Sequence, residues 1–169
     1  MPRTPIHIAP LSKADIPACV HIMSQSLPWT RYQITEESAR KLWSAALATE
    51  AAVVVARLEG QTMGFAWYIE HGGFGLGGYL KLLGVHAAAR GRGVGGALLD
   101  HVEWLADQHG QRDLFLLVSD FNAPAQAFYR ARGYTQVGEI PDLVVSGIAE
   151  LIFRKRLKGF RDPPTAVGW

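Results

Sequence analysis

The chain has a single cysteine, Cys19, among its 169 residues. One thiol excludes an intrachain disulfide and any metal site built from cysteines, so we expect no metal cofactor. Long apolar runs are also missing, because no stretch reaches the roughly 18 residues that a membrane-spanning helix needs. The first residues, MPRTPIHIAPLSKAD, lack the apolar core of a signal peptide. These absences predict a cytoplasmic protein that does not associate with membranes.

Strong charge of one sign is missing too. The 17 Lys and Arg residues nearly balance 15 Asp and Glu, for a formal net charge of +2. Nucleic-acid-binding proteins usually carry a concentrated basic stripe, so nucleic acid is not an expected partner. Apolar residues make up 49% of the chain, which favours a folded protein. The length predicts one domain over residues 1–169, with residues 158–169 as a C-terminal tail.

Apolar periodicity predicts an α/β fold with a mixed sheet. The runs at residues 79–85 and 114–118 are apolar on both faces, as in central strands. A helix-patterned run at residues 93–109 joins them, which predicts a right-handed parallel crossover. Further strands are expected at residues 6–9, 51–58, 62–70, 134–140 and 149–157, further helices at 12–25, 35–48 and 122–132, and a flexible loop at 71–78. The sheet would have about six to seven strands, flanked by about four helices.

The start of the predicted helix at 93–109 conflicts with the usual rules. Residues 90–96 read RGRGVGG, with no Ser, Thr, Asp or Asn in the capping place. Glycine inside a helix costs on the order of 1 kcal/mol relative to alanine, and Arg90 and Arg92 stand at the positive end of the helix dipole. A bound anion explains all of this, because bare N–H groups and arginines would hold it while glycine lets it approach. The alternative is a plain glycine-rich turn with both arginines in water.

The type of anion stays open at this point. A P-loop would need Gly-x-x-x-x-Gly-Lys-Ser/Thr, and the chain has no such string. Residues 91–96 match the bare dinucleotide pattern Gly-x-Gly-x-x-Gly. A dinucleotide site also expects an acidic residue at the end of the next strand, whereas Asp113 precedes that strand. A protein that binds NAD and not coenzyme A is therefore the weaker alternative.

Two segments resemble the GNAT superfamily of N-acetyltransferases. LLGVHAAARGRGVGGALL is similar to its acetyl-CoA-binding segment, Arg/Gln-x-x-Gly-x-Gly/Ala at a helix start, through Arg90, Gly93 and Gly95. About 30 residues later, NAPAQAFYRARGYTQVG resembles a second family segment. It matches through Asn122, Ala125, Phe128, Tyr129, Gly133 and Tyr134. The resemblance covers residues 79–140 closely and implies a GNAT-like sheet that is splayed at its centre, where the strands around Val85 and Val118 separate.

The resemblance implies acetyl-CoA as the cofactor. The strand at residues 83–85 would pair with the pantetheine amides, and the backbone of residues 91–96 would hold the pyrophosphate. Asn122 would contact the cofactor arm, and Tyr129 would lie near the sulfur. The implied cofactor-binding residues are Leu83, Gly84, Val85, Arg90, Gly91, Arg92, Gly93, Val94, Gly95, Gly96, Asn122, Phe128 and Tyr129.

The implied activity is transfer of an acetyl group to a primary amine by direct attack, with the Tyr129 hydroxyl as general acid for the CoA thiolate. Tyr129 as a plain core aromatic is the alternative. Through SLPWTRY the chain slightly resembles the family members that acetylate the N-termini of ribosomal proteins. Those members carry a glutamate base where this chain has Leu117. Glu70 is therefore the candidate base, with His71, His86, Asp120 or a water chain as alternatives. A non-catalytic acyl-CoA-binding or regulatory domain is the rival function.

The acceptor amine, a small molecule or a peptide, would lie near residues 27–32. Trp29, Arg31 and Tyr32 are the candidate contacts, and Arg31 would suit a carboxylate, although Trp29 could equally fill the core. Phe74 and residues 141–148 could also line this pocket. Exposed strand edges near the C-terminus would allow a homodimer.

Overall fold

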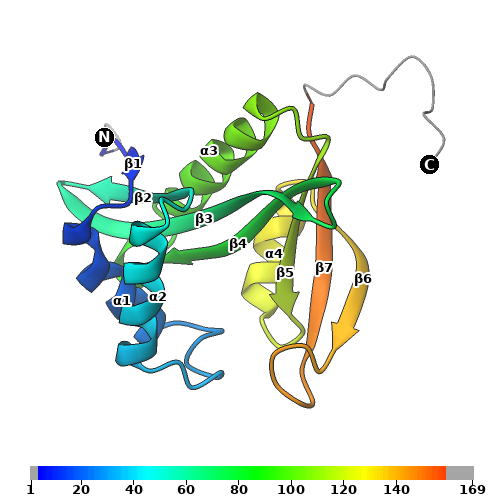
Figure 1. The fold of residues 1–169 in the computed structure, drawn as a ribbon, viewed down its shortest axis with the longest axis horizontal. Coiled ribbons are helices and arrows are strands. Elements are labelled where there is room, and N and C mark those ends of the chain that lie inside the picture. Colours follow the sequence, from blue (N-terminus) through cyan, green and yellow to red (C-terminus); the bar gives the residue numbers. More distant parts are fainter. Residues whose placement is uncertain (1–3, 159–169) are drawn as a thin grey trace.

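The computed structural model describes residues 4–158, and Figure 1 shows the arrangement of its elements. The elements are β1 (His7–Pro10), η1 (Lys13–Asp15), α1 (Ile16–Ser24), α2 (Glu36–Ala48), β2 (Val53–Leu58), β3 (Gln61–Gly73), β4 (Gly77–Val85), η2 (Ala87–Ala89), α3 (Val94–Gln108), β5 (Asp113–Ser119), α4 (Ala123–Ala131), β6 (Thr135–Pro141) and β7 (Ala149–Arg156), where η marks a 3₁₀ helix. No helix in this part of the chain is long and apolar enough to cross a membrane. The predicted tail lies almost entirely outside the described residues.

The strands form one seven-stranded sheet in the order β1-β2-β3-β4-β5-β7-β6. Every neighbouring pair is antiparallel except β4 and β5, which are parallel and joined through α3. The predicted mixed sheet with four flanking helices and its central crossover is confirmed. Strand β6 lies at one edge of the sheet, and the homodimer stays a prediction.

The sheet splits at its centre, between β4 and β5. The two strands pair only at Gly78–Leu80 with Leu114–Leu116. In the β3–β4 ladder, Trp67 is opposite Leu82 and Tyr68 is opposite Leu80, so Lys81 is an extra residue in β4. Such a bulge bends its strand and increases the local twist. Beyond Lys81, β4 and β5 diverge (Figure 1), which confirms the predicted splay.

The two helix pairs cover opposite faces of the sheet. On one face, α1 and α2 pack around Trp43 and Phe65, whose ring centroids lie 4.6 Å apart. On the other face, α3 packs through Leu98 and Val102, and Tyr129 of α4 belongs to the same core. Because side chains alternate along a strand, neighbouring residues of β5 and β7 serve different faces.

The predicted flexible loop at residues 71–78 is mostly strand. Strand β3 extends to Gly73 and β4 begins at Gly77, which leaves a turn of three residues. The glycines permit close contact here. A Cβ atom at Gly73 would lie 2.4 Å from the Phe115 ring, and one at Gly77 would lie 2.6 Å from the Asp113 carbonyl oxygen. The prediction at 12–25 also changes in detail, because η1 follows Ser12 and α1 begins only at Ile16.

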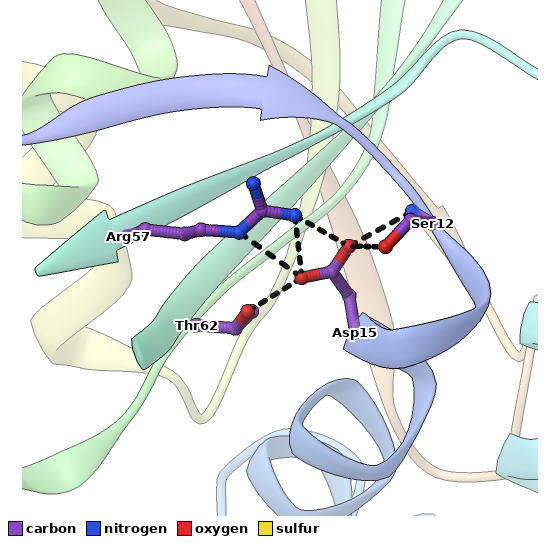
Figure 2. Close-up of polar contacts among 4 residues, drawn as sticks. All are labelled: Ser12, Asp15, Arg57 and Thr62. Atoms are coloured by element: carbon purple, nitrogen blue, oxygen red, sulfur yellow. Dashed lines mark hydrogen bonds and ion pairs between the residues drawn. The ribbon is translucent and has the colours of Figure 1, made fainter. Parts of the chain in front are cut away.

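Asp15 joins the start of α1 to the β2–β3 hairpin (Figure 2). Its carboxylate, 2% exposed, accepts hydrogen bonds from Ser12, from the Thr62 hydroxyl at 2.6 Å and from two guanidinium nitrogens of Arg57. Burial alone would raise the pKa of Asp15, but the hydrogen bonds from Ser12, Thr62 and Arg57 outweigh burial and lower it. This cluster ties the start of α1 to the sheet.

Replacing Asp15 with asparagine should lower the free energy of unfolding at pH 7 by about 2–3 kcal/mol, because hydrogen bonds to a charged group are strong. The lowered folded-state pKa makes this contribution complete above the unfolded value, about 3.9, and it is lost as pH falls through the folded-state pKa. Urea unfolding from pH 7 to pH 2 measures the gap between the two proteins. The exposed Asp107→Asn serves as control and should stay within about 0.5 kcal/mol. Equal stability of wild type and Asp15→Asn at pH 7 would contradict this role.

Candidate active site

A pocket with a volume of about 1040 Å³ lies where β4 and β5 separate. It is lined from both halves of the sheet, from the start of α3, from α4 and from the segment between α1 and α2. The residues predicted from the sequence that line it are Leu83, Gly84, Val85, Arg90, Gly91, Gly93, Val94, Gly95, Gly96, Asn122, Phe128, Tyr129, Trp29 and Tyr32. The pocket therefore brings together most of the predicted site, from segments far apart in the chain.

Helix α3 begins at this pocket without a side-chain cap. Its N-cap residue is Gly93, which has a left-handed backbone (φ +89°) that glycine adopts most easily. The first N–H groups of a helix have no partner within the helix, and here no side chain hydrogen-bonds to them. Val94, Gly95 and Gly96 line the pocket at this point. The arrangement is suited to binding an anion.

The cations around the helix start differ from those predicted. Arg90 lines the pocket and donates a hydrogen bond to the Ser26 hydroxyl at 3.3 Å. Arg92 does not line it, because its guanidinium is 45% exposed and lies 3.8 Å from the Glu59 carboxylate. Arg132, which follows α4, lines the pocket although its guanidinium also lies 2.8 Å from the Asp100 carboxylate, and a Cβ atom on Gly96 would lie 1.9 Å from one of its guanidinium nitrogens. The sequence around Arg132 carries no local signal for this role.

Tyr129 enters the pocket from the face covered by α3 and α4. Its ring packs edge-on against Phe128 and Tyr134, with centroids 5.1 and 5.6 Å away. Within residues 4–158, no group forms a hydrogen bond with its hydroxyl. Burial raises the pKa of Tyr129 well above its ordinary value, and Tyr79 adds to the effect. The hydroxyl is therefore protonated at neutral pH and free to donate.

Glu150 lies at the opposite face of the sheet, in contact with Tyr32 and Ser119. Its neighbours on the two strands, Leu151 and Val118, belong to the core under α3 and α4, so Glu150 and Ser119 face α1 and α2. Glu150 is 5% exposed and accepts hydrogen bonds from the Tyr32 hydroxyl and, at 3.2 Å, from the Ser119 hydroxyl. Burial raises the pKa of Tyr32 to about 12, and the hydrogen bond to Glu150 contributes.

Glu150 is the only acidic side chain among the described residues that line the pocket. Sequence reasoning missed it. The available signal was a glutamate at the start of the run AELIFRKRL, where alternation sets it on the face opposite Leu151 and Phe153. Its partner Tyr32 is 118 positions away in the chain, so no local pattern joins the two.

Glu70, the predicted base, lies away from the pocket, near the end of β3. Its carboxylate oxygens are 3.4 Å from His71 Nε2 and 3.6 Å from His109 Nδ1. None of these three residues lines the pocket.

The remaining predicted contacts divide between the pocket and its surroundings. His86 stacks on His21 with ring centroids 5.4 Å apart, and the Asp120 carboxylate accepts the Ala149 N–H at 3.0 Å. Arg31 lies over the Phe121 ring, 4.3 Å from its centroid. These three predicted residues and Phe74 are absent from the pocket lining, whereas Val144 and Val145 of the predicted 141–148 loop line it. Residues 4–158 contain no group of three or more side chains arranged to hold a metal ion.

The GNAT acetyltransferase family matches residues 16–134 of this chain. A solved structure of a GNAT-family protein from Desulfovibrio desulfuricans has a TM-score of 0.77 and 21% identity, over 90% of this chain and 99% of its own. A ribosomal-protein-alanine N-acetyltransferase from Brucella melitensis has a TM-score of 0.71 and 25% identity, over 89% and 99%. A Salmonella typhimurium protein solved with its cofactor acetyl-CoA has a TM-score of 0.71 and 19% identity, over 97% and 100%.

The matched region includes two of the segments that line the pocket, the start of α3 and the helix that carries Tyr129. The mixed, splayed sheet agrees with that of the solved structures over nearly their whole length. This family uses acetyl-CoA as its acetyl donor. The chain belongs to the GNAT family of acetyltransferases.

Proposed function

We propose that this protein transfers the acetyl group of acetyl-CoA to a primary amine, which attacks the thioester directly. The observation that carries the proposal is that one continuous pocket opens where the sheet splits. It joins the uncapped start of α3 and Tyr129 on one face to Glu150 on the other. A donor held from one face can then meet an acceptor that enters from the other. The Brucella relative, named as an alanine N-acetyltransferase, supports nitrogen as the acceptor atom.

The residues present fit coenzyme A. N–H groups at the start of α3, with Arg90 and Arg132, would hold the pyrophosphate. The edge of β4 after Leu80 has no strand beside it and would bind the pantetheine amides. Asn122 caps α4 through its side-chain oxygen, which accepts the Ala125 N–H at 3.3 Å and leaves its amide NH₂ free to donate. Bound acetyl-CoA supplies an acetyl thioester, which is open to nucleophilic attack.

Tyr129 would act as the general acid. Its raised pKa keeps the proton on the hydroxyl at neutral pH, and a buried phenol next to the departing sulfur can deliver that proton as the C–S bond breaks. Its position is fixed by rings on two sides, Phe128 and Tyr134. The role thus follows from a protonated, unpartnered hydroxyl in a rigid setting.

A panel of primary amines incubated with acetyl-CoA tests the proposal, with release of free thiol as the readout. We expect acetylation of at least one acceptor, confirmed by the mass of the product. Tight coenzyme A binding without turnover on any amine would contradict the enzyme and favour a non-catalytic acyl-CoA-binding domain.

Gly93→Asp should weaken coenzyme A binding, because it adds a negative charge where the pyrophosphate would lie. Charge at a helix terminus is worth up to about 2 kcal/mol, or roughly 30-fold in affinity. Gly93→Asn is the matched control, since asparagine has the same size and tolerates the left-handed backbone. Calorimetric titration with coenzyme A measures both variants. Equal affinities for the two would argue against a phosphate site at Gly93.

The two arginines of RGRGVGG should differ in effect. Arg90→Gln should weaken coenzyme A binding by roughly 10-fold or more, because it removes a charge-assisted donor from the pocket. Arg92→Gln should change it by less than about two-fold, because its guanidinium is exposed and lies near Glu59. The same titration compares the pair, and a larger loss from Arg92→Gln would show that the helix start binds the cofactor differently.

Tyr129→Phe should lower kcat by about 100-fold and change coenzyme A affinity by less than about three-fold, as expected for a general acid. The matched control is Tyr68→Phe, which removes the hydroxyl of a buried tyrosine outside the pocket. Steady-state kinetics and calorimetry measure the two quantities. An unchanged kcat in Tyr129→Phe would exclude the acid role.

A further inference from the structure

We propose that Glu150 binds the ammonium group of the acceptor and takes its proton, and that the acceptor is a primary amine with one positive charge on an apolar body. This inference rests on the proposed acetyl transfer and names the acceptor class of the same site. A free alkylamine and the N-terminus of a peptide with an apolar first residue share this chemistry.

The hydrogen bonds of Glu150 leave one carboxylate oxygen available. The Tyr32 hydroxyl donates to Oε1, and Ser119 Oγ lies 2.5 Å from the Tyr32 oxygen and 3.2 Å from Oε1, whereas Oε2 has only a long contact of 3.4 Å with Ser119 Oγ. An ionised carboxylate has about four acceptor positions, so Oε2 can accept from a ligand N–H group. Tyr32 and Ser119 also fix the orientation of the carboxylate, which positions Oε2 before the acceptor arrives.

The charged residues of the pocket favour an acceptor with one positive charge, which would pair with Glu150. The other charged lining residues, Lys81, Arg90 and Arg132, are all positive. Arg90 and Arg132 lie at the helix start, and the Lys81 ammonium lies 4.0 Å from the centre of the Trp67 ring. A single buried carboxylate therefore matches one ammonium group, while a second cation or a carboxylate on the acceptor would be left unpaired at a cost.

Several of the pocket-lining side chains on the face of α1 and α2, where Glu150 lies, are apolar, which fits an apolar body on the amine. They come from the segment between α1 and α2, from α2, from β4 and from the loop before β7. The apolar side chains in question are Trp29, Ile34, Leu42, Leu82, Val144 and Val145. Burying apolar surface of the acceptor against them favours binding by about 25 cal/mol per Å².

The proton balance assigns one step to each carboxyl or hydroxyl group. The ammonium gives one proton to Glu150 Oε2, and the freed lone pair forms the N–C bond while the C–S bond breaks. Tyr129 donates its proton to the sulfur, and the nitrogen loses a second proton that replaces it. One proton in total leaves to solvent from Glu150.

The ionisable groups that interact with Glu150 or Tyr32 are Tyr79, from β4, and Asp120, which follows β5.

Glu150→Gln tests the assignment, with Glu139→Gln, an exposed glutamate on the adjacent strand β6, as the matched control. The acceptors are hexylamine and Leu-Gly-Gly amide, which distinguish the two sources, with 1,6-diaminohexane and 6-aminohexanoate as doubly charged comparisons. Wild type should prefer hexylamine or the peptide over the doubly charged acceptors by about 10-fold or more in kcat/KM. Glu150→Gln should lower kcat/KM for the preferred acceptor by about 100-fold, and Glu139→Gln should not.

Two further readouts separate this role from a structural one. Wild-type kcat/KM should fall above the pKa of the ammonium, about 10.4 as in lysine, whereas in Glu150→Gln it should rise toward that pKa, because only the free amine then reacts. In calorimetry of the CoA-bound protein, hexylammonium should bind at least about 10-fold more weakly to Glu150→Gln than to wild type, with coenzyme A affinity unchanged. If Glu150→Gln unfolds, Glu150→Asp retains the charge and should keep the wild-type direction of the pH profile.

The outcomes are distinguishable. Absence of acetylation by wild type on every amine would overturn the proposed function itself. Acetylation by wild type with Glu150→Gln within three-fold of it, or a preference for the doubly charged acceptors, would overturn only the assignment of Glu150.

Discussion

The extra residue Lys81 in β4 is the constraint on which the rest of the structure depends. It bends β4 at the point where pairing with β5 ends, after Leu80. Without that bend the parallel pair would continue, and its backbone groups would be satisfied by each other. With it, one edge of β4 is left for a ligand, and side chains from both faces of the sheet meet in one pocket.

The start of α3 lies at the same pocket and also lacks a partner for its backbone N–H groups. A local rule is broken there in several ways, since the N-cap is a glycine, no side chain caps the helix and cations stand nearby. Such a conflict has a physical reason when a ligand supplies the missing partner. In the proposed function the pyrophosphate of coenzyme A does so, because Gly93 lets the backbone turn sharply and Val94, Gly95 and Gly96 line the pocket. The free energy lost by leaving the start of α3 uncapped is then offset by the binding of coenzyme A.

Tyr129 and Glu150, the two groups of the proposed mechanism, lie on opposite faces of the sheet. Tyr129 is held in the core under α3 and α4, where burial keeps its proton in place. Glu150 is held on the other face by Tyr32 and Ser119. In the proposed mechanism, the proton donor for the leaving group and the carboxylate for the incoming amine therefore lie on opposite faces of the sheet and meet through its central opening.

The order of strands and helices could be predicted from the sequence because it depends on local periodicity, and residues 79–140 carried two recognisable motifs. Glu150 and Arg132 could not, because their roles arise from contacts between distant segments, such as Tyr32 with Glu150. The position of Arg92 outside the pocket lining could not be predicted either, because spacing alone does not tell which way a side chain turns after the left-handed Gly91. The glycines at 72–78 suggested flexibility, whereas Gly73 and Gly77 pack closely against Phe115.

Hydrogen–deuterium exchange with and without coenzyme A tests the central claim most directly, because it reports on backbone N–H groups one segment at a time. The account predicts slower exchange on binding in residues 82–85 of β4 and 93–96 at the start of α3, with little change in the β1–β2 pair. Coenzyme A binding that leaves both segments unchanged would contradict it.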